Sequence, residues 1–293
     1  MKSFSLSDAL YNLSQSSNFK EIISKNKFKS NIMIESFNAS MLLSSIFKNI
    51  DNNIMIVTAK PDDASFLYEQ LLFWLNNEID LYHFVGNDIF AYDKSDFDIQ
   101  SSSKRVEVLA NKINNLNKQS ITVASLEAIL QKTISSISIK ETTHSLKVGD
   151  DIAVDTLISR WLNLGYQKDS IVYAPGMMSR RGGILDIYPT GLFNPVRIEF
   201  WGDKIESIRE FDVNTQRTLE LIDSVQILPF YEYVPNLSNI GSINSQLESL
   251  NWENTSKKTK NVIKSELTKL LSGYEVENNS FYMGFFNQDT ILN

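Results

Sequence analysis

Two carboxylates and two arginines between residues 181 and 199 are the side chains best placed to do chemistry. Asp186 and Glu199 lie in segments predicted as neighbouring strands, where a pair of carboxyl groups could act as general acid and base. Arg181 and Arg197 are close to them in sequence, and pairs of opposite charge are common across neighbouring strands. Charge pairing is therefore the favoured interpretation, and catalysis by this pair is the less favoured alternative.

The elements that position these side chains follow from alternation and glycine placement. Val196, Ile198 and Phe200 alternate with charged residues, which puts apolar side chains on one sheet face and charges on the other. A tight turn at Gly202 leads into a predicted strand at 204–211. Further expected elements are strands at 171–174, 183–188 and 224–228, an extended segment at 135–148, and a helix at 155–164 that Asp155 could cap and Gly165 ends. An α+β domain is therefore expected over 135–221, with a polar face that is either packed or used for docking.

The earlier part of the chain predicts an α/β domain. Strands are expected at 31–35, 54–58, 79–85 and 120–124, and helices at 42–50, 61–75, 103–116 and 126–133. Strands that alternate with helices imply a parallel sheet with crossover helices. The predicted division is 1–134, 135–221 and 222–293. The resemblance described below implies that 135–221 is an inserted α+β domain and that 222–293 returns to the first domain and is incomplete at its end.

A nucleotide site is not expected in this parallel-sheet domain. A P-loop needs glycines that let backbone N–H groups approach phosphates, a lysine, and a hydroxyl group for Mg²⁺. The turn at 35–41 reads Glu-Ser-Phe-Asn-Ala-Ser-Met, and the first glycine of the chain is Gly86. A dinucleotide fingerprint fails for the same reason. The segment is therefore predicted to have no cofactor and no catalytic activity.

Composition narrows the remaining classes of function. The chain has no cysteine and only two histidines, which argues against disulfides and against zinc, and loop 93–98 lacks the glycine and the closing Glu of a calcium loop. The net charge of −7 argues against a bare nucleic-acid-binding module. No apolar run is long enough for a membrane span and no secretory signal is visible, so a cytoplasmic setting is expected. One predicted helix is basic, with Glu253 and Glu266 diluting its charge, so a solvated face is favoured over phosphate binding; its lysines are Lys257, Lys258, Lys260, Lys264 and Lys269.

A dense set of residues carries a family resemblance over about residues 30–235. The set comprises Gly165-Tyr166, Pro175-Gly176, Arg181-Gly182-Gly183-Ile184-Leu185-Asp186-Ile187, Pro189, Pro195, Arg197, Glu199-Phe200, Asp203, Ile205-Glu206-Ser207-Ile208-Arg209, Phe211-Asp212 and Gln216-Arg217. With these residues the chain resembles the amino-terminal, UvrB-like part of the bacterial transcription-repair coupling factors, the Mfd family. The excision-repair helicase UvrB is similar here, but it has an intact P-loop, which this chain lacks.

The resemblance implies a fold and a function. It implies a degenerate helicase-like (P-loop-type) parallel-sheet domain without ATPase activity, and an inserted α+β domain that recruits the repair protein UvrA to stalled RNA polymerase. It maps the UvrA contacts onto Arg181, Arg197, Trp201 and Asp203, although the family more often has Phe at the position of Trp201. In the family, RNA polymerase, duplex DNA, ATP and Mg²⁺ are bound further along, in an ATP-dependent DNA translocase, and this chain is expected to be a fragment that stops before those domains. The alternatives are a UvrB-type helicase subunit that binds damaged DNA and a bare DNA-binding module.

Overall fold

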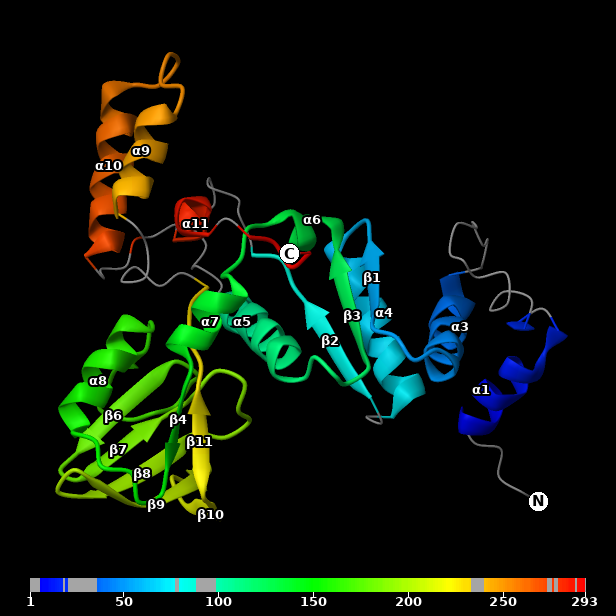
Figure 1. Ribbon diagram of the computed structural model, residues 1–293, viewed down its shortest axis with the longest axis horizontal. Coiled ribbons are helices and arrows are strands. Elements are labelled where there is room, and N and C mark those ends of the chain that lie inside the picture. The colour runs from blue at the N-terminus through cyan, green and yellow to red at the C-terminus, as the bar shows by residue number, and fades with distance from the viewer. Residues whose placement is uncertain are drawn as a thin grey trace. The chain divides into compact units, whose positions relative to one another are not determined.

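The computed structural model describes most of the chain, and its elements are labelled in Figure 1. The described residues are 6–17, 19–20, 36–76, 79–87, 99–232, 240–272, 276, 279–287 and 289–292. They form two compact units, one of Met1–Gly86 with Asn115–Leu130 and one of Asn87–Asn114 with Gln131–Asn293. This division places the helix at 99–114 in the second unit, and the predicted domain boundaries stay a prediction.

The first unit is built on a short parallel sheet. Its elements are α1 (Leu6–Gln15), α3 (Ser36–Asn49), β1 (Ile54–Thr58), α4 (Pro61–Leu75), β2 (Asp80–Phe84), β3 (Ser120–Ser125) and α6 (Leu126–Leu130). The strands lie in the order β1-β3-β2, and both pairings are parallel. Proline at the first helical position and acidic residues in the first turn favour the start of α4, and Asn76 in the left-handed conformation ends it.

The core of this unit lies between α4 and the sheet. Every residue of the central strand β3 is buried, and Ile121 and Val123 pack with Leu71, Leu75 and Phe47. Ser120, Thr122 and Ser125 of β3 are buried as well, as expected for a central strand covered on both faces. The predicted parallel sheet is confirmed, whereas the strand expected at 31–35 and the loop at 93–98 lie outside the described residues.

The second unit contains a larger, mostly antiparallel sheet. Its elements are α5 (Ile99–Asn114), α7 (Ser136–Thr142), β4 (His144–Lys147), α8 (Val154–Asn163), β5 (Gln167–Lys168), β6 (Met177–Arg181), β7 (Ile184–Ile187), β8 (Val196–Trp201), β9 (Lys204–Phe211), β10 (Thr218–Ile222), β11 (Ser224–Ile227), α9 (Ile240–Ser249), α10 (Lys257–Leu271), the 3-10 helix η2 (Asn279–Tyr282) and α11 (Met283–Phe286). Six strands lie in the order β10-β9-β8-β7-β6-β5, and β11 pairs separately with β4. The α+β character predicted for this part of the chain is confirmed.

Three local predictions are wrong. The segment 135–148 is not extended throughout, because Ser135 accepts a hydrogen bond from Ser138 N at 3.0 Å and caps helix α7. Residues 171–174 form no strand, although Val172 is buried there. Asp155 does not cap α8, whose N-cap is Ala153, and its carboxylate pairs instead with Arg180.

A buried polar cluster, here called the Glu232 hub, joins distant parts of the second unit. Glu232 and Arg105 are both fully buried, and Arg105 Nε donates to Glu232 Oε2 at 2.7 Å. Asn87 Nδ2 donates to the same oxygen at 2.9 Å, and the Thr133 hydroxyl donates to Oε1. Asn287 Nδ2 donates to the backbone oxygen of Glu232 at 2.9 Å. The hub satisfies both carboxylate oxygens, as a buried charge requires.

Two glycines of the resemblance set are explained by packing against aromatic rings. Gly165 has φ +94° and Gly176 has φ +86°, and a Cβ atom at either would come within 2.3 Å of an aromatic ring, that of Tyr231 or Phe230 respectively. The hydroxyl of Tyr166 donates to Leu228 O at 2.9 Å on the same side. These residues therefore pack the segment at 165–176 against the segment at 228–231.

Candidate protein-docking surface on the six-stranded sheet

Strand β8 divides its side chains between two different environments. Val196, Ile198 and Phe200 are buried, whereas Arg197 is half-buried and Trp201 is 78% exposed. Figure 1 shows helix α8 beside this sheet, and α8 itself has a buried face. The side of the sheet that carries Val196, Ile198 and Phe200 is here called the covered side. The alternation predicted from the sequence is confirmed, and it leaves one side of the sheet open.

The open side carries two cross-strand ion pairs. Asp186 lies opposite Arg197 in the ladder and receives Arg197 Nε at 2.7 Å and Nη2 at 2.8 Å. This bidentate hydrogen bond raises the pKa of Arg197. The Arg197 guanidinium also lies over the Phe211 ring, 4.7 Å from its centroid. Arg197 is therefore held in place on both sides.

Glu199 forms its ion pair with Arg209. It pairs with neither Arg181 nor Arg197, the two arginines that the sequence suggested. The Ser207 hydroxyl donates to Glu199 Oε2 at 2.8 Å. This hydrogen bond, with Arg209 as a further cause, lowers the pKa of Glu199. A carboxylate held ionised in this way is poorly suited to act as a general acid, so the geometry favours charge pairing over catalysis.

Arg181 differs from Arg197 in its surroundings. It is the exposed last residue of β6, and its Nη2 atom donates to Ser170 O at 2.9 Å. Among the ion pairs of the described residues, none gives Arg181 a carboxylate. The guanidinium is therefore positioned at the surface by a neutral carbonyl.

Two tight turns bring Arg181, Trp201 and Asp203 to the same end of the sheet. Gly182 has φ +60° and Gly202 has φ +62°, a region that glycine enters without strain. Gly183 O accepts a hydrogen bond from Phe200 N at 2.8 Å, so the β6–β7 turn lies against the end of β8. Asp203 is exposed in the second turn, and its backbone oxygen accepts from Ile152 N at 2.7 Å. Arg197 lies further along β8, away from this end.

One strand of the open side, β10, was not predicted from the sequence. Strand β10 is an edge strand whose Leu219 is 53% exposed and whose Leu221 is 73% exposed. Leu221 lies opposite Arg209 in the ladder and so faces the open side. The alternation in Thr-Leu-Glu-Leu-Ile is the signal that could have revealed this strand.

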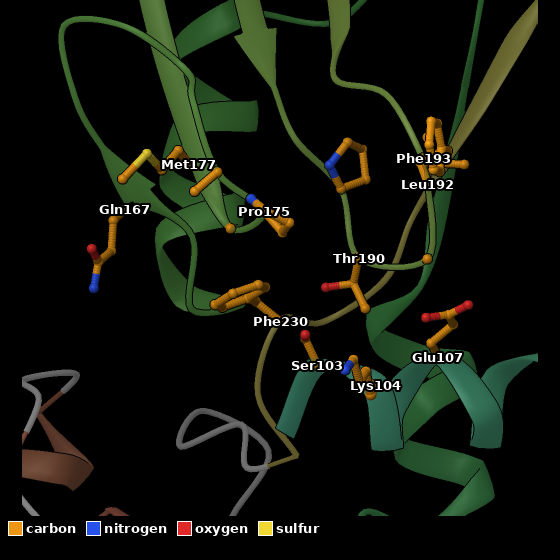
Figure 2. Close-up of a pocket in the computed structure, with 14 residues that line it drawn as sticks. Ser103, Lys104, Glu107, Gln167, Pro175, Met177, Thr190, Leu192, Phe193 and Phe230 are labelled. Atoms are coloured by element: carbon orange, nitrogen blue, oxygen red, sulfur yellow. The ribbon is translucent and has the colours of Figure 1, made fainter. Parts of the chain in front are cut away.

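A cavity of about 660 Å³ lies elsewhere in the second unit (Figure 2). Its walls are mainly apolar and include Pro175, Met177 and Phe230, with Lys104 and Glu107 of α5 at one side. Burial raises the pKa of Glu107, and the neighbouring Lys104 partly offsets this effect. The volume is in the range of small-molecule sites, about 300–1,000 Å³. This cavity was not predicted, because its walls combine α5, two strands and loops that are far apart in the sequence.

The described residues show neither a metal-ligand cluster nor a membrane-spanning helix. They contain no group of three or more His, Cys, Asp or Glu side chains arranged to hold a metal ion. The helices described here include none that is long and apolar enough to cross a membrane.

Comparisons with known proteins point in the same direction as the sequence. Residues 145–233 match the family model of the UvrB interaction domain. The chain is 27% identical over 242 residues to the transcription-repair-coupling factor of Staphylococcus aureus (strain bovine RF122 / ET3-1), an alignment that covers 82% of this chain and 20% of the relative. It is 30% identical over 230 residues to that of Staphylococcus haemolyticus (strain JCSC1435), covering 78% of this chain and 19% of the relative. The chain thus spans about a fifth of the length of the curated relatives it matches. These matches confirm the resemblance: the chain is similar to the amino-terminal, UvrB-like region of the transcription-repair-coupling factors, and it carries a UvrB interaction domain.

Proposed function

We propose that this chain binds the excision-repair protein UvrA through the open side of its six-stranded sheet, as the repair-recruiting part of a transcription-repair coupling factor. The observation that carries the proposal is the exposed end of the sheet, where Trp201 and Arg181 lie at neighbouring turns, and where Arg181 has no carboxylate partner among the described residues. Tryptophan and arginine are the residue types most enriched at the energetic centres of protein interfaces. The match to a UvrB interaction domain supports the choice of partner.

The two arginines have different roles in this proposal. Arg181 has no carboxylate partner among the described residues, so a carboxylate of UvrA can pair with it without breaking an existing ion pair. Arg197 already holds Asp186, whose side chain is only 4% exposed. Arg197 therefore keeps the sheet surface in shape, and Arg181 is the direct anchor.

The experiment measures UvrA binding by this chain with single substitutions. Arg181→Ala and Trp201→Ala are each expected to weaken binding about 30-fold, which corresponds to about 2 kcal/mol. Arg180→Ala is the matched control, because this neighbouring arginine faces the covered side and pairs with Asp155. It is expected to change affinity less than threefold.

Two results would contradict the proposal. One is the absence of a complex between UvrA and the unsubstituted chain, and the other is an equal loss for Arg180→Ala and Arg181→Ala. Arg197→Ala is expected to lower both UvrA affinity and thermal stability, because it leaves the buried Asp186 carboxylate unpaired. Arg181→Ala should leave the melting temperature unchanged.

The wider activity of a coupling factor is part of the same proposal. Binding of RNA polymerase and duplex DNA, and translocation driven by ATP and Mg²⁺, are assigned to regions outside this chain, which spans about a fifth of its relatives. ATP hydrolysis by the purified chain would instead favour a UvrB-type helicase subunit. The glycine-free sequence before Gly86 argues against that outcome.

A further inference from the structure

Helix α10 concentrates positive charge in a chain that is acidic overall. It carries five lysines in 15 residues, whereas the net charge of the chain is −7. At about 100° per residue, Lys257, Lys260 and Lys264 project within about 60° of one another, over an axial span of about 10 Å. Lys258 and Lys269 project beside them. The lysines therefore share one half of the helix surface.

Glu266 faces away from Lys257 and Lys264 but lies about 60° from Lys269, three positions later. Glu266 is nine positions after Lys257, about 180° around the helix. Its Oε2 atom accepts a hydrogen bond from the Tyr282 hydroxyl at 2.5 Å, and this contact, together with burial, raises the pKa of Tyr282. The dilution expected from the sequence therefore applies to Lys269 and not to Lys257 or Lys264.

The lysines of α10 have no carboxylate partners within the part of the chain that the structure describes. Lys257, Lys258, Lys264 and Lys269 are exposed. Lys260 lies over the Trp252 ring, 4.9 Å from its centroid, and the indole N–H of Trp252 donates to Leu247 O at 3.2 Å. One ammonium group is thus held in position while the others remain free at the surface.

The start of the helix places two of these lysines at an electrostatically unfavourable position. Ser256 caps it by accepting a hydrogen bond from Thr259 N at 3.0 Å, and its first turn contains no acidic residue. Lys257 and Lys258 occupy that turn, at the positive end of the helix dipole, where cations are unfavourable by a few tenths of a kcal/mol each. A bound anion would relieve this repulsion.

We propose that the lysine face of α10 contacts the phosphate backbone of duplex DNA. Lysines act as point charges towards phosphates, and no arginine is present on α10 for bidentate reading of a base. The expected contact is therefore independent of base sequence and positions the chain on DNA. This site is separate from the sheet surface proposed for UvrA, so the two proposals can fail independently.

The test compares two triple variants that remove the same charge from different places. One is Lys257→Gln/Lys258→Gln/Lys264→Gln in α10. The matched control is Lys140→Gln/Lys147→Gln/Lys168→Gln, which changes three exposed lysines elsewhere. Binding of each full chain to a labelled 25-base-pair duplex is followed by fluorescence anisotropy between about 50 and 200 mM salt.

The expected result follows from counterion release. Each phosphate contact contributes about −0.9 to the slope of log affinity against log salt, so three lysines contribute about −2.7, or about a 40-fold change over this fourfold range of salt. The α10 variant should lose this part of the slope, the control should retain it, and the corresponding Lys→Arg variant of α10 should also retain it. UvrA binding should be unchanged in all of them.

Three outcomes would overturn the proposal. Absence of salt-dependent DNA binding by the unsubstituted chain is the first. Equal loss in the two triple variants is the second, because it would show an effect of net charge alone. Tighter binding of polyglutamate than of duplex DNA, lost in the α10 variant, is the third, and it would assign the face to an acidic protein. Melting curves identify any variant that fails to fold. If the Lys→Gln variant of α10 does not fold, the Lys→Arg variant provides the test: the proposal requires that it retain the salt dependence of DNA binding.

Discussion

Replacing the buried carboxylate of the Glu232 hub tests whether this cluster holds the second unit together. Glu232→Gln keeps the shape of the side chain but removes its charge. In one orientation the new NH₂ group faces the Arg105 and Asn87 donors, and in the other the fully buried guanidinium of Arg105 meets only a neutral carbonyl. Removing one partner of a buried ion pair costs about 3–5 kcal/mol.

The assay is urea denaturation followed by circular dichroism, with hydrogen exchange of α5 reporting on the second unit. For a slope near 3 kcal/mol per molar urea, a loss of about 4 kcal/mol lowers the midpoint by about 1.3 M. Asp155→Asn is the control, because its ion pair with Arg180 is largely exposed and such pairs contribute at most about 1 kcal/mol.

A double variant separates the ion pair from other effects of substitution. The double variant Arg105→Met/Glu232→Gln should lose less free energy of unfolding than the sum of the two single changes, by at least about 1.5 kcal/mol. The reason is that each single variant keeps one unpaired buried charge, whereas the double variant keeps none. The reasoning is refuted if Glu232→Gln costs less than about 1 kcal/mol, or if the two changes are additive.

Two further predictions concern stability. Gly176→Ala should lower the free energy of unfolding by about 2 kcal/mol or more, because Gly176 combines φ +86° with a position against the Phe230 ring. Gly182→Ala should lower it by only about 1–2 kcal/mol, because Gly182 has φ +60° but open space around it. Equal melting temperatures of the two variants would contradict this account. Burial, with a smaller effect of Arg160, lowers the pKa of His144 to about 4, and its Nε2 atom accepts from the Trp161 indole N–H at 3.0 Å. Because the unfolded chain takes up this proton near pH 6.5 and the folded chain only near pH 4, stability should fall as the pH drops through that window. Melting temperatures between pH 7.5 and 4.5 should show a shallower fall in His144→Gln, and an identical fall would exclude His144 as a cause.

Much of the sheet was predictable because its signals are local. The strands β1 and β9 have the bounds expected from the sequence, and β8 lies where Val196, Ile198 and Phe200 alternate with charged residues. Strand β1 is marked by a short apolar run, and the Gly202 turn separates β8 from β9. Strand β6 was missed because Met-Met-Ser-Arg-Arg shows no alternation. Residues 171–174 have strand-like composition, but Val172 O accepts a hydrogen bond from the Gln216 side chain, outside any ladder.

Contacts between distant segments were not predictable from one sequence. The Glu232 hub joins residues separated by 127 and 145 positions, and no local pattern marks its members. The pairing of Glu199 with Arg209, and not with a nearer arginine, depends on the β8–β9 register and its irregularity after Glu199. The assignment of Arg181, Arg197, Trp201 and Asp203 to a docking surface stays a prediction, but the structure distinguishes a free arginine from a paired one.

The hub also limits how the interaction domain can be separated from its surroundings. A chain trimmed to residues 145–233, the part that matches the family model, would retain Glu232 and lose Arg105, Asn87 and Thr133. It would also lose His144, where β4 begins opposite Ile227. The stretch that matches the family model is therefore not self-contained, because its buried carboxylate is bonded to residues outside it. Transfer of this stretch to another protein would require a residue without a carboxylate at position 232, or transfer of Arg105 together with it.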